Sequence, residues 1–313
     1  MESEDAPRFS FVLPAFNEEA NIRTMAERLL AVGAALGHPF EIVFVNDGSS
    51  DGTEEQLDRL AAEHPAIRPL HFSRNFGHMA ALTAGFEHAR ATGAIICLDA
   101  DGQHPPELIP DMIRLWEGGA EVVQMLRTES EGTGFVKRLT SRGFYRVLNA
   151  LSGMGVTEGA ADFRLLDRQV LDALNSLPER ARFIRGLVFW VGYKRAFLPF
   201  EAPERSAGTT KYGFRKMLAF ALTGITSFSS RPLQLPLYLG AGLCALSLFG
   251  AAGLLLRWLL AGAPPGWAWV LWAVILLGAL QLICVGVVSE YIARMYFETK
   301  QRPVYLLRRK RPE

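Results

Sequence analysis

Two aspartates stand one residue apart directly after a short apolar run. The segment Asp99-Ala100-Asp101-Gly102-Gln103-His104 follows Ala94–Leu98, which reads as a buried parallel strand. Open α/β sheets bind ligands at the carboxyl ends of their strands. Oxygen ligands at this spacing suit Mg²⁺ or Mn²⁺ holding a diphosphate. The alternative is an ordinary capped loop, because Asp and Gly are common turn residues and Pro105-Pro106 begins the next helix.

A second charged cluster is basic and follows the strand expected at 120–126. If residues 137–149 are helical, Arg138, Arg142 and Arg146 share one face at intervals of four residues. Like charges placed in this way repel one another unless an anion lies among them. The net charge of the whole chain is only +1, which argues against nucleic acid as a main partner.

The elements around these clusters alternate between strands and helices. Expected strands are Phe9–Pro14, Glu41–Asn46, Ile67–Phe72, Ala94–Leu98, Ala120–Leu126 and one near Lys194–Phe200. One helix is expected to begin near Asn21 and a second to begin after Thr53. A third is expected to end at Ala91, and a fourth to cover residues 106–116. This alternation predicts a doubly wound, mostly parallel sheet. No G-x-G-x-x-G follows the first strand, so a dinucleotide-dependent redox enzyme lacks its main signature.

The C-terminal third is much more apolar. Between Arg231 and Glu290 the only charged residue is Arg257. The charge-free runs 232–256 and 258–289 are each long enough for a membrane span, which needs about 20 residues. An amphipathic interface helix is expected just before them, and a basic segment follows. By the positive-inside rule both termini and the sheet domain are expected in the cytoplasm, and the tail is expected to set topology and contact anionic lipid.

These features divide the chain into four parts. We expect a catalytic domain over 1–210, an interface helix over 211–231, two transmembrane helices over 232–291 and a basic tail over 292–313. The cysteines, Cys97, Cys244 and Cys284, lie in apolar runs and show no metal-binding spacing or disulfide framework.

Four motifs in this order resemble family 2 glycosyltransferases of the GT-A fold. They are Pro14-Ala15-Phe16-Asn17-Glu18, Asn46-Asp47-Gly48-Ser49-Ser50-Asp51-Gly52-Thr53, Arg74-Asn75-Phe76-Gly77 and Asp99–Pro106. The two apolar runs narrow the resemblance to the polyprenyl-phosphate glycosyltransferases, which include dolichol-phosphate mannose synthases and bacterial undecaprenyl-phosphate glucosyltransferases. The third motif often continues with lysine in relatives. Here it continues with His78, whose role is left open.

The resemblance implies roles for particular residues. Asp47 is expected to contact the nucleotide base, with a simple Asp47-Gly48 turn as the alternative. Pro14, Asn17 and Glu18 are expected to line the same pocket, or only to cap a helix. Asp101 and Gln103 are expected to bind the metal directly, and Asp99 to hold the sugar-ribose end or a metal-bound water. His104 is expected to be structural.

Asp162 lies in a small-residue stretch with no obvious need for a strand or cap. The resemblance makes it a catalytic-site residue, either a base or an orienting group. The alternative is a salt bridge to Arg164, two residues on. The phosphate-binding candidates are Arg127, Arg138, Arg142, Arg205 and Lys211, because arginine offers paired hydrogen bonds to phosphate oxygens.

Taken together, the sequence predicts an inverting, Mg²⁺- or Mn²⁺-dependent transferase. It would move a sugar from a nucleotide sugar, with UDP favoured, to a polyprenyl phosphate such as undecaprenyl phosphate. The expected location is the bacterial inner membrane, with homo-oligomers packed through the transmembrane hairpin. Two alternatives remain: a transferase acting on another lipid or a polysaccharide, and a non-catalytic nucleotide-sugar-binding membrane scaffold.

Overall fold

The computed structural model describes residues 6–128, 157, 159–180, 182–201, 242, 249 and 266–308. Its strands are β1 (Phe9–Ala15), β2 (Phe40–Asn46), β3 (Ile67–His71), β4 (Ala94–Cys97), β5 (Val122–Arg127), β6 (Ala160–Asp167) and β7 (Arg195–Phe200). Its helices are α1 (Glu19–Ala35), α2 (Thr53–Glu63), α3 (His78–His88), η1 (Pro106–Leu108), α4 (Ile109–Glu117), α6 (Arg168–Ser176), α7 (Ile184–Trp190) and α10 (Gly266–Thr299). Each strand expected from the sequence forms, with ends displaced by at most two residues.

The strands make one mixed sheet in the order β3-β2-β1-β4-β6-β5-β7. The pairs β1–β2, β2–β3, β1–β4 and β5–β7 are parallel, whereas β6 is antiparallel to both of its neighbours. β6, which contains Asp162, was not among the strands expected from the sequence. β6 lacks an apolar signature on one face because Asp162 and Arg164 are charged. Both side chains are nevertheless buried, in a strand that pairs with β4 on one side and β5 on the other.

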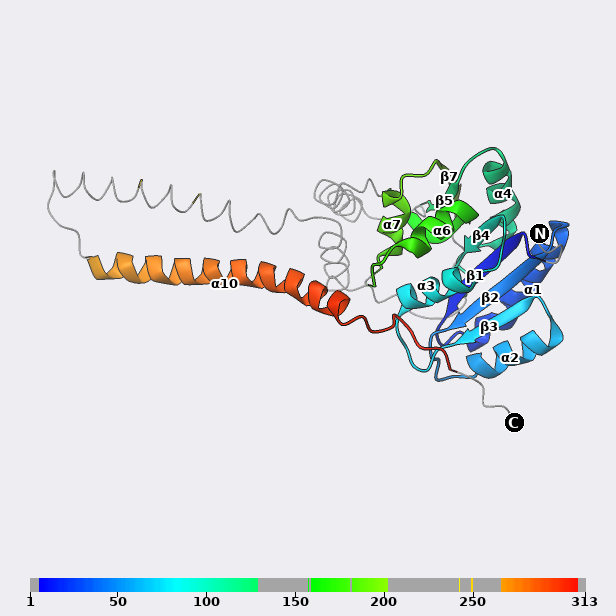
Figure 1. Cartoon of the computed structure of the whole chain (residues 1–313), viewed down its shortest axis with the longest axis horizontal. Coiled ribbons are helices and arrows are strands. Elements are labelled where there is room, and N and C mark those ends of the chain that lie inside the picture. The colour runs from blue at the N-terminus through cyan, green and yellow to red at the C-terminus, as the bar shows by residue number, and fades with distance from the viewer. Residues whose placement is uncertain are drawn as a thin grey trace.

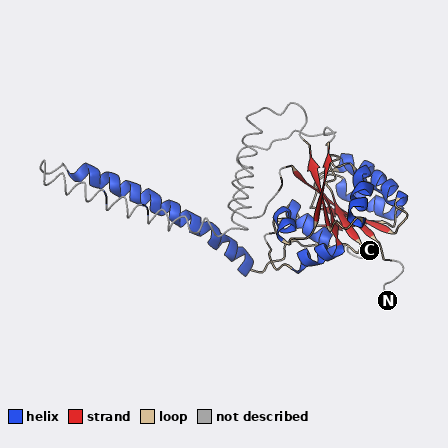
Figure 2. Cartoon of the chain, turned by 90° about the horizontal axis from the view of Figure 1, so that it is seen from above, coloured by secondary structure: helices blue, strands red, loops and turns tan. Residues whose placement is uncertain are grey.

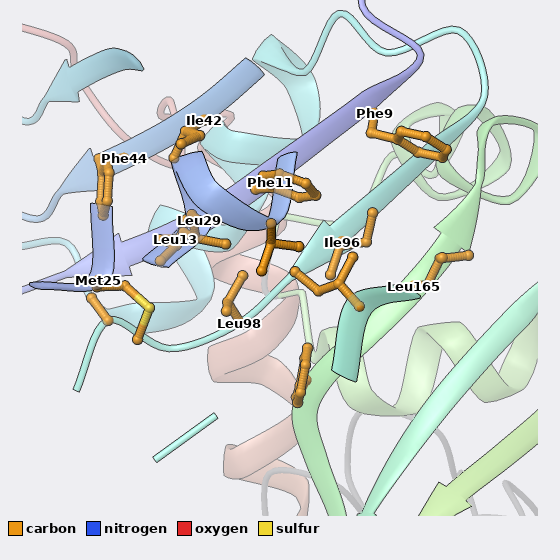
Figure 3. Close-up of a cluster of buried hydrophobic side chains, with 14 of the residues drawn as sticks. Phe9, Phe11, Leu13, Met25, Leu29, Ile42, Phe44, Ile96, Leu98 and Leu165 are labelled. Carbon is orange, nitrogen blue, oxygen red and sulfur yellow. The ribbon is translucent and has the colours of Figure 1, made fainter. Parts of the chain in front are cut away.

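Helices cover both faces of the sheet (Figure 2). The alternation of side chains along each strand explains why both faces are apolar. Phe9, Phe11 and Leu13 of β1 point to the face covered by α1, α2 and α4, and the intervening Val12 packs against the face covered by α3, α6 and α7. Figure 3 shows the first of these clusters, in which Met25 and Leu29 of α1 contact the strand residues. Continuous apolar strands of this kind are typical of a sheet buried on both sides.

The predicted membrane region is described only in part. The interface helix expected over 211–231 lies outside the described residues, as does the first expected span apart from positions 242 and 249. α10 covers residues 266–289 of the second expected span and extends away from the sheet domain (Figure 1). No helix in the described part of the chain is both long enough and apolar enough to cross a membrane. The two-span hairpin stays a prediction.

Candidate active site

The sheet topology gathers the predicted site residues at one edge. β1, β2, β4 and β5 run in the same direction, so the residues that follow them emerge at the same edge. β6 runs the other way, which brings its beginning, with Asp162, to this edge as well. Asp47, Asp99, Arg127 and Asp162 therefore come from four different strands to one region. Between β1 and β4 the strand order changes direction, which is where open α/β sheets bind ligands.

The acidic segment after β4 is a tight turn that presents its carboxylates. Asp99 N donates to Nδ1 of His104 at 2.9 Å, and Gln103 N donates to Oδ1 of Asp101 at 3.0 Å. Gly102 has φ +79°, a conformation that favours glycine. Arg127 Nη1 lies 3.4 Å from Oε1 of Gln103, so the end of β5 reaches the same turn. The segment is thus a loop of defined geometry with acidic and amide oxygens on it.

His104 contacts the backbone of this turn, as expected for a structural residue. It is buried, and its ring stacks on Phe163 of β6 with centroids 5.3 Å apart. Burial lowers the pKa of His104 despite the nearby carboxylate of Asp99. A neutral imidazole is what the contact with Asp99 N requires, because Nδ1 must accept that hydrogen bond. Burial also raises the pKa of Asp99, against the attraction of His104 and His78.

The donors on this turn fit a hard divalent cation that shares a diphosphate with the protein. Within the described residues, no group of three or more His, Cys, Asp or Glu side chains is arranged to hold a metal ion. Mg²⁺ sites on nucleotide enzymes commonly use one or two carboxylates together with substrate phosphates, rather than a cage made by the protein alone. Asp101 and Asp99 with the amide oxygen of Gln103 match that donor set.

Asp162 is held by three basic side chains. Arg164 Nη2 lies 2.5 Å from its Oδ1, and Arg185 of α7 makes a paired contact, with Nε 2.9 Å from Oδ1 and Nη2 2.6 Å from Oδ2. Nε2 of His78, at the start of α3, lies 3.6 Å from Oδ2 of Asp162 and 3.8 Å from Oδ1 of Asp99. The predicted salt bridge to Arg164 is therefore present. His78 links the Asp162 cluster to the acidic turn.

These contacts determine the charge of Asp162. Burial alone would raise its pKa, but the charges of Arg185 and Arg164 and the contact with His78 outweigh that effect and hold the pKa well below the usual range. A carboxylate this acidic is a weak proton acceptor. Its geometry favours an orienting role, the second of the two readings that the sequence left open. For His78 burial lowers the pKa, but Asp162 and Asp99 outweigh it and raise the pKa.

Asp47 contacts the loop between β3 and α3. It is buried, and its carboxylate accepts hydrogen bonds from the backbone N–H groups of Phe76, at 2.7 Å, and Gly77, at 3.0 Å. Burial raises its pKa despite these contacts. The turn after β2 is closed by Asn46, whose Oδ1 accepts from Ser49 N, and not by Asp47. The base contact expected for Asp47 stays a prediction.

An open cleft of about 1030 Å³ lies beside the acidic turn. Its lining includes Asn17, Glu18, Asp51 and Asp101. Asn17 has φ +57°, and its Oδ1 accepts from Ser50 N at 2.9 Å, so it joins the loop after β1 to the loop after β2 instead of capping α1. Pro14 is a buried residue of β1, and its expected role at the nucleotide stays a prediction. Asn17 and Glu18, which are expected to line the nucleotide pocket, therefore line the same cleft as Asp101.

The loop 73–77 lies directly against the turn after β2. A Cβ built on Gly48 would be 2.3 Å from the backbone carbon of Arg74, and Gly48 has φ +65°. Gly37 has nearly the same backbone angle, φ +66°, but open space around it. We expect Gly37→Ala to cost about 1 kcal/mol from backbone strain, and Gly48→Ala about 2 kcal/mol more from the clash. The Tm of Gly48→Ala should then lie about 4–8 °C below the Tm of Gly37→Ala. Equal losses would contradict this close packing.

Several predicted phosphate-binding residues are not described. Arg138, Arg142, Arg205 and Lys211 lie outside the described residues. Of the candidates only Arg127 is placed, at the end of β5, where it contacts Gln103 of the acidic turn. Sequence reasoning missed Arg185. It is 23 residues from Asp162 in the chain, and no local pattern connects the two.

The comparisons with known proteins agree with this architecture. Residues 10–174 match the family Glycosyl transferase family 2. An uncharacterized glycosyltransferase of Synechocystis is 42% identical over 95% of this chain and 94% of its own. A prophage bactoprenol glucosyl transferase homolog of Escherichia coli is 39% identical, with 96% and 99% covered. The bactoprenol glucosyl transferase of Shigella phage SfV is 38% identical, with 96% and 98% covered. This chain therefore belongs to glycosyl transferase family 2 and is a glycosyltransferase.

Proposed function

We propose that this chain transfers a sugar from a UDP-linked donor to the phosphate of a membrane polyprenol and releases UDP. The observation that carries the proposal is the meeting of the acidic turn 99–104 with the Asp162 cluster at one edge of the sheet. The acceptor class is supported by the similarity over nearly the whole chain to proteins named bactoprenol glucosyl transferases. Undecaprenyl phosphate is the acceptor we propose.

In this reaction an oxygen of the acceptor phosphate attacks the anomeric carbon while the bond from that carbon to the diphosphate oxygen breaks. The configuration at the carbon is inverted. The acceptor needs little deprotonation, because a phosphate monoester has its second pKa at about 6 and is already anionic below that pH. This agrees with Asp162 as a group whose lowered pKa keeps it ionised near neutral pH, where it fixes Arg185 and His78. Arg127 lies where a phosphate oxygen could replace Gln103 as its partner.

Asp101, Gln103 and Asp99 would hold Mg²⁺ or Mn²⁺. When bound, the ion supplies positive charge that neutralises the departing diphosphate. The protein provides the two carboxylates and the amide oxygen from one turn whose backbone is fixed by His104 and Gly102.

We further propose that residues 232–256 and 258–289 form a hairpin in the bacterial inner membrane, with the sheet domain and both termini in the cytoplasm. Support comes from the absence of charge in both runs and from the basic residues after them. A site at the membrane surface would let a polyprenyl phosphate react without leaving the bilayer. Homo-oligomers packed through the hairpin are part of this proposal.

The test uses the purified full-length protein with undecaprenyl phosphate in detergent. Labelled UDP- and GDP-sugars are supplied one at a time, with Mg²⁺ or Mn²⁺. We expect label to enter the organic phase from a UDP-sugar, with one nucleoside diphosphate released per sugar transferred. If every donor fails to label the polyprenyl phosphate while labelling another lipid or a polysaccharide, the acceptor is wrong. If nucleotides bind without any turnover, the scaffold reading holds instead.

A further inference from the structure

The chain that follows α10 returns to the sheet domain and pairs with it. Leu307 forms an antiparallel bridge with Phe72, just beyond the end of β3. Ser73 N donates to Leu306 O at 2.9 Å, and Arg308 N donates to His71 O at 2.7 Å. Figure 1 shows this segment running from the end of α10 to the side of the sheet formed by β3. We call residues Val304–Leu307 the C-terminal strap.

Tyr305 is the main side-chain contact of the strap. Its ring stacks on the ring of Phe72, with centroids 5.0 Å apart and planes inclined by 13°. Its hydroxyl donates to Oε2 of Glu87 on α3 at 2.6 Å. Phe72 is fully buried and packs edge to face against Phe76, with centroids 5.6 Å apart. Tyr305 therefore joins the end of β3 to α3 across the loop that connects them.

The loop 73–77 that connects β3 to α3 contacts the carboxylate of Asp47. The N–H groups of Phe76 and Gly77 donate to its carboxylate, and Gly48 packs directly against the backbone of Arg74. A continuous series of contacts therefore runs from Tyr305 through Phe72 and Phe76 to the turn after β2. Nothing in this series belongs to the acidic turn or to the Asp162 cluster.

We propose that the C-terminal strap is a positioning element of the donor site, with Tyr305 as its positioning residue. The strap holds Phe72 and Phe76 so that loop 73–77 stays closed on Asp47. The strap follows α10 in the chain. The last turn of that helix also contacts the domain directly, where Arg180 N donates to the Glu298 carboxylate at 3.1 Å. The expected effect on donor binding rests on the proposed function, whereas the expected effect on the conformation of loop 73–77 does not.

The test compares three variants of the full-length protein. Tyr305→Ala removes the ring, and Tyr305→Phe keeps the ring but removes the hydroxyl. Trp116→Ala is the matched control: its half-buried ring packs edge to face on the buried Phe9 at 6.0 Å, and its Nε1 donates to Asp167 at 2.7 Å, but it lies where β1 begins. Any purely structural loss of an aromatic contact should appear in both alanine variants.

Hydrogen exchange is followed in the peptide that contains Phe76 and Gly77, and UDP affinity is measured by calorimetry with Mg²⁺. The donor KM and kcat are measured where turnover occurs. An aromatic pair of this kind corresponds to about a fivefold change in an equilibrium constant. We expect Tyr305→Ala to speed exchange and to raise the UDP Kd and the donor KM, each by about fivefold, with kcat within about twofold. Tyr305→Phe should restore all of these, and Trp116→Ala should lower Tm without changing them.

Two results would overturn the proposal. Unchanged exchange in Tyr305→Ala would show that the strap does not hold the loop, whether or not the chain transfers sugar. Faster exchange with an unchanged UDP Kd would show that the loop is not part of the donor site. Sugar transfer to polyprenyl phosphate could stand in either case, so failure of this inference is distinguishable from failure of the proposed function.

Discussion

Replacing Asp101 with Asn is expected to lower sugar transfer by about 10³-fold, equivalent to about 4 kcal/mol of transition-state free energy. The substitution keeps the size of the side chain and its acceptor for Gln103 N, seen at 3.0 Å in the structure. It removes one of the negative charges that would hold a divalent cation beside the departing diphosphate. The measurement is the initial rate of labelled sugar entering undecaprenyl phosphate at saturating donor.

Asp111→Asn is the matched control for this prediction. Asp111 lies in the first turn of α4, ten residues along the same chain segment, and pairs on the surface with Arg114. Its removal should leave transfer within about twofold, because exposed ion pairs contribute about 0–1 kcal/mol. Excess EDTA should reduce the wild-type rate to that of Asp101→Asn, and added Mn²⁺ should restore only the wild type. Full transfer by Asp101→Asn in EDTA would remove the metal from the proposed mechanism.

Local signals explain which parts of the fold could be predicted. β1, β2 and β4 are short apolar runs followed by turn residues, and their ends agree with the sequence within one residue. The acidic turn was predictable for the same reason, since Asp99, Asp101 and Gln103 directly follow one of these runs. Every feature needed for that prediction lies within about ten consecutive residues.

β6 shows why other parts could not be predicted. Its buried Asp162 and Arg164 look like loop residues in the sequence, and they are tolerated inside only because they pair with each other and with Arg185. Burying a charge without a partner is strongly unfavourable, so the strand depends on a contact made far along the chain. A hydrophobicity pattern carries no information about such a partner.

The C-terminal segment gives the same lesson. Its basic residues favoured a role in topology and lipid contact, but Arg308 pairs with Glu54 of α2 at 3.0 Å, and the strap pairs with residues 71–73. The apolar run Val304-Tyr305-Leu306-Leu307 was the available signal. Its partner segment lies more than 200 residues earlier, so the sequence could indicate an apolar contact but not where it is made.

Substitution of Asp162 is expected to cause a large loss of stability. Arg164 is 1% exposed, and in the described part of the chain its Nε and Nη1 have no hydrogen-bond partner, so Asp162 is the carboxylate that balances its charge. Asp162→Asn keeps the shape and removes that balance from both arginines. We expect a loss of about 3 kcal/mol, the lower end for a broken buried pair because Arg185 is partly solvated. The Tm should fall by about 6–12 °C.

Asp172→Asn is the surface counterpart of this substitution. Asp172 pairs with Arg168 at 2.8 Å on the exposed side of α6, and we expect a loss of about 1 kcal/mol or less. Similar Tm values for the two variants would contradict the description of Asp162 as the centre of a buried charge cluster. Thermal unfolding of the full-length protein in one detergent measures both.

The pH dependence of the stability lost in Asp162→Asn has a defined sign. The pKa of Asp162 is depressed in the folded protein, so its ionised form contributes stability that is complete above the unfolded value of about 3.9 and is lost as the pH falls through the folded value. The Tm difference between wild type and Asp162→Asn should therefore be largest near about pH 5 and shrink below about pH 4. It should also decrease as the pH rises and His78 loses the proton that Asp162 helps to hold, because Asp162 raises the pKa of His78. A difference that already closes when the pH falls to about 6 would mean that Asp162 titrates in the range of a general base.

The same argument separates the two roles of Asp162 in catalysis. If Asp162 only orients Arg185 and His78, then an acid limb of kcat near about pH 6 belongs to the second ionisation of the acceptor phosphate. That limb should persist in Asp162→Asn, at a lower rate throughout. If Asp162 instead accepted a proton, the limb would disappear with the carboxylate. The depressed pKa and the paired contact with Arg185 favour the first outcome, because a carboxylate neutralised in this way gains little from a proton.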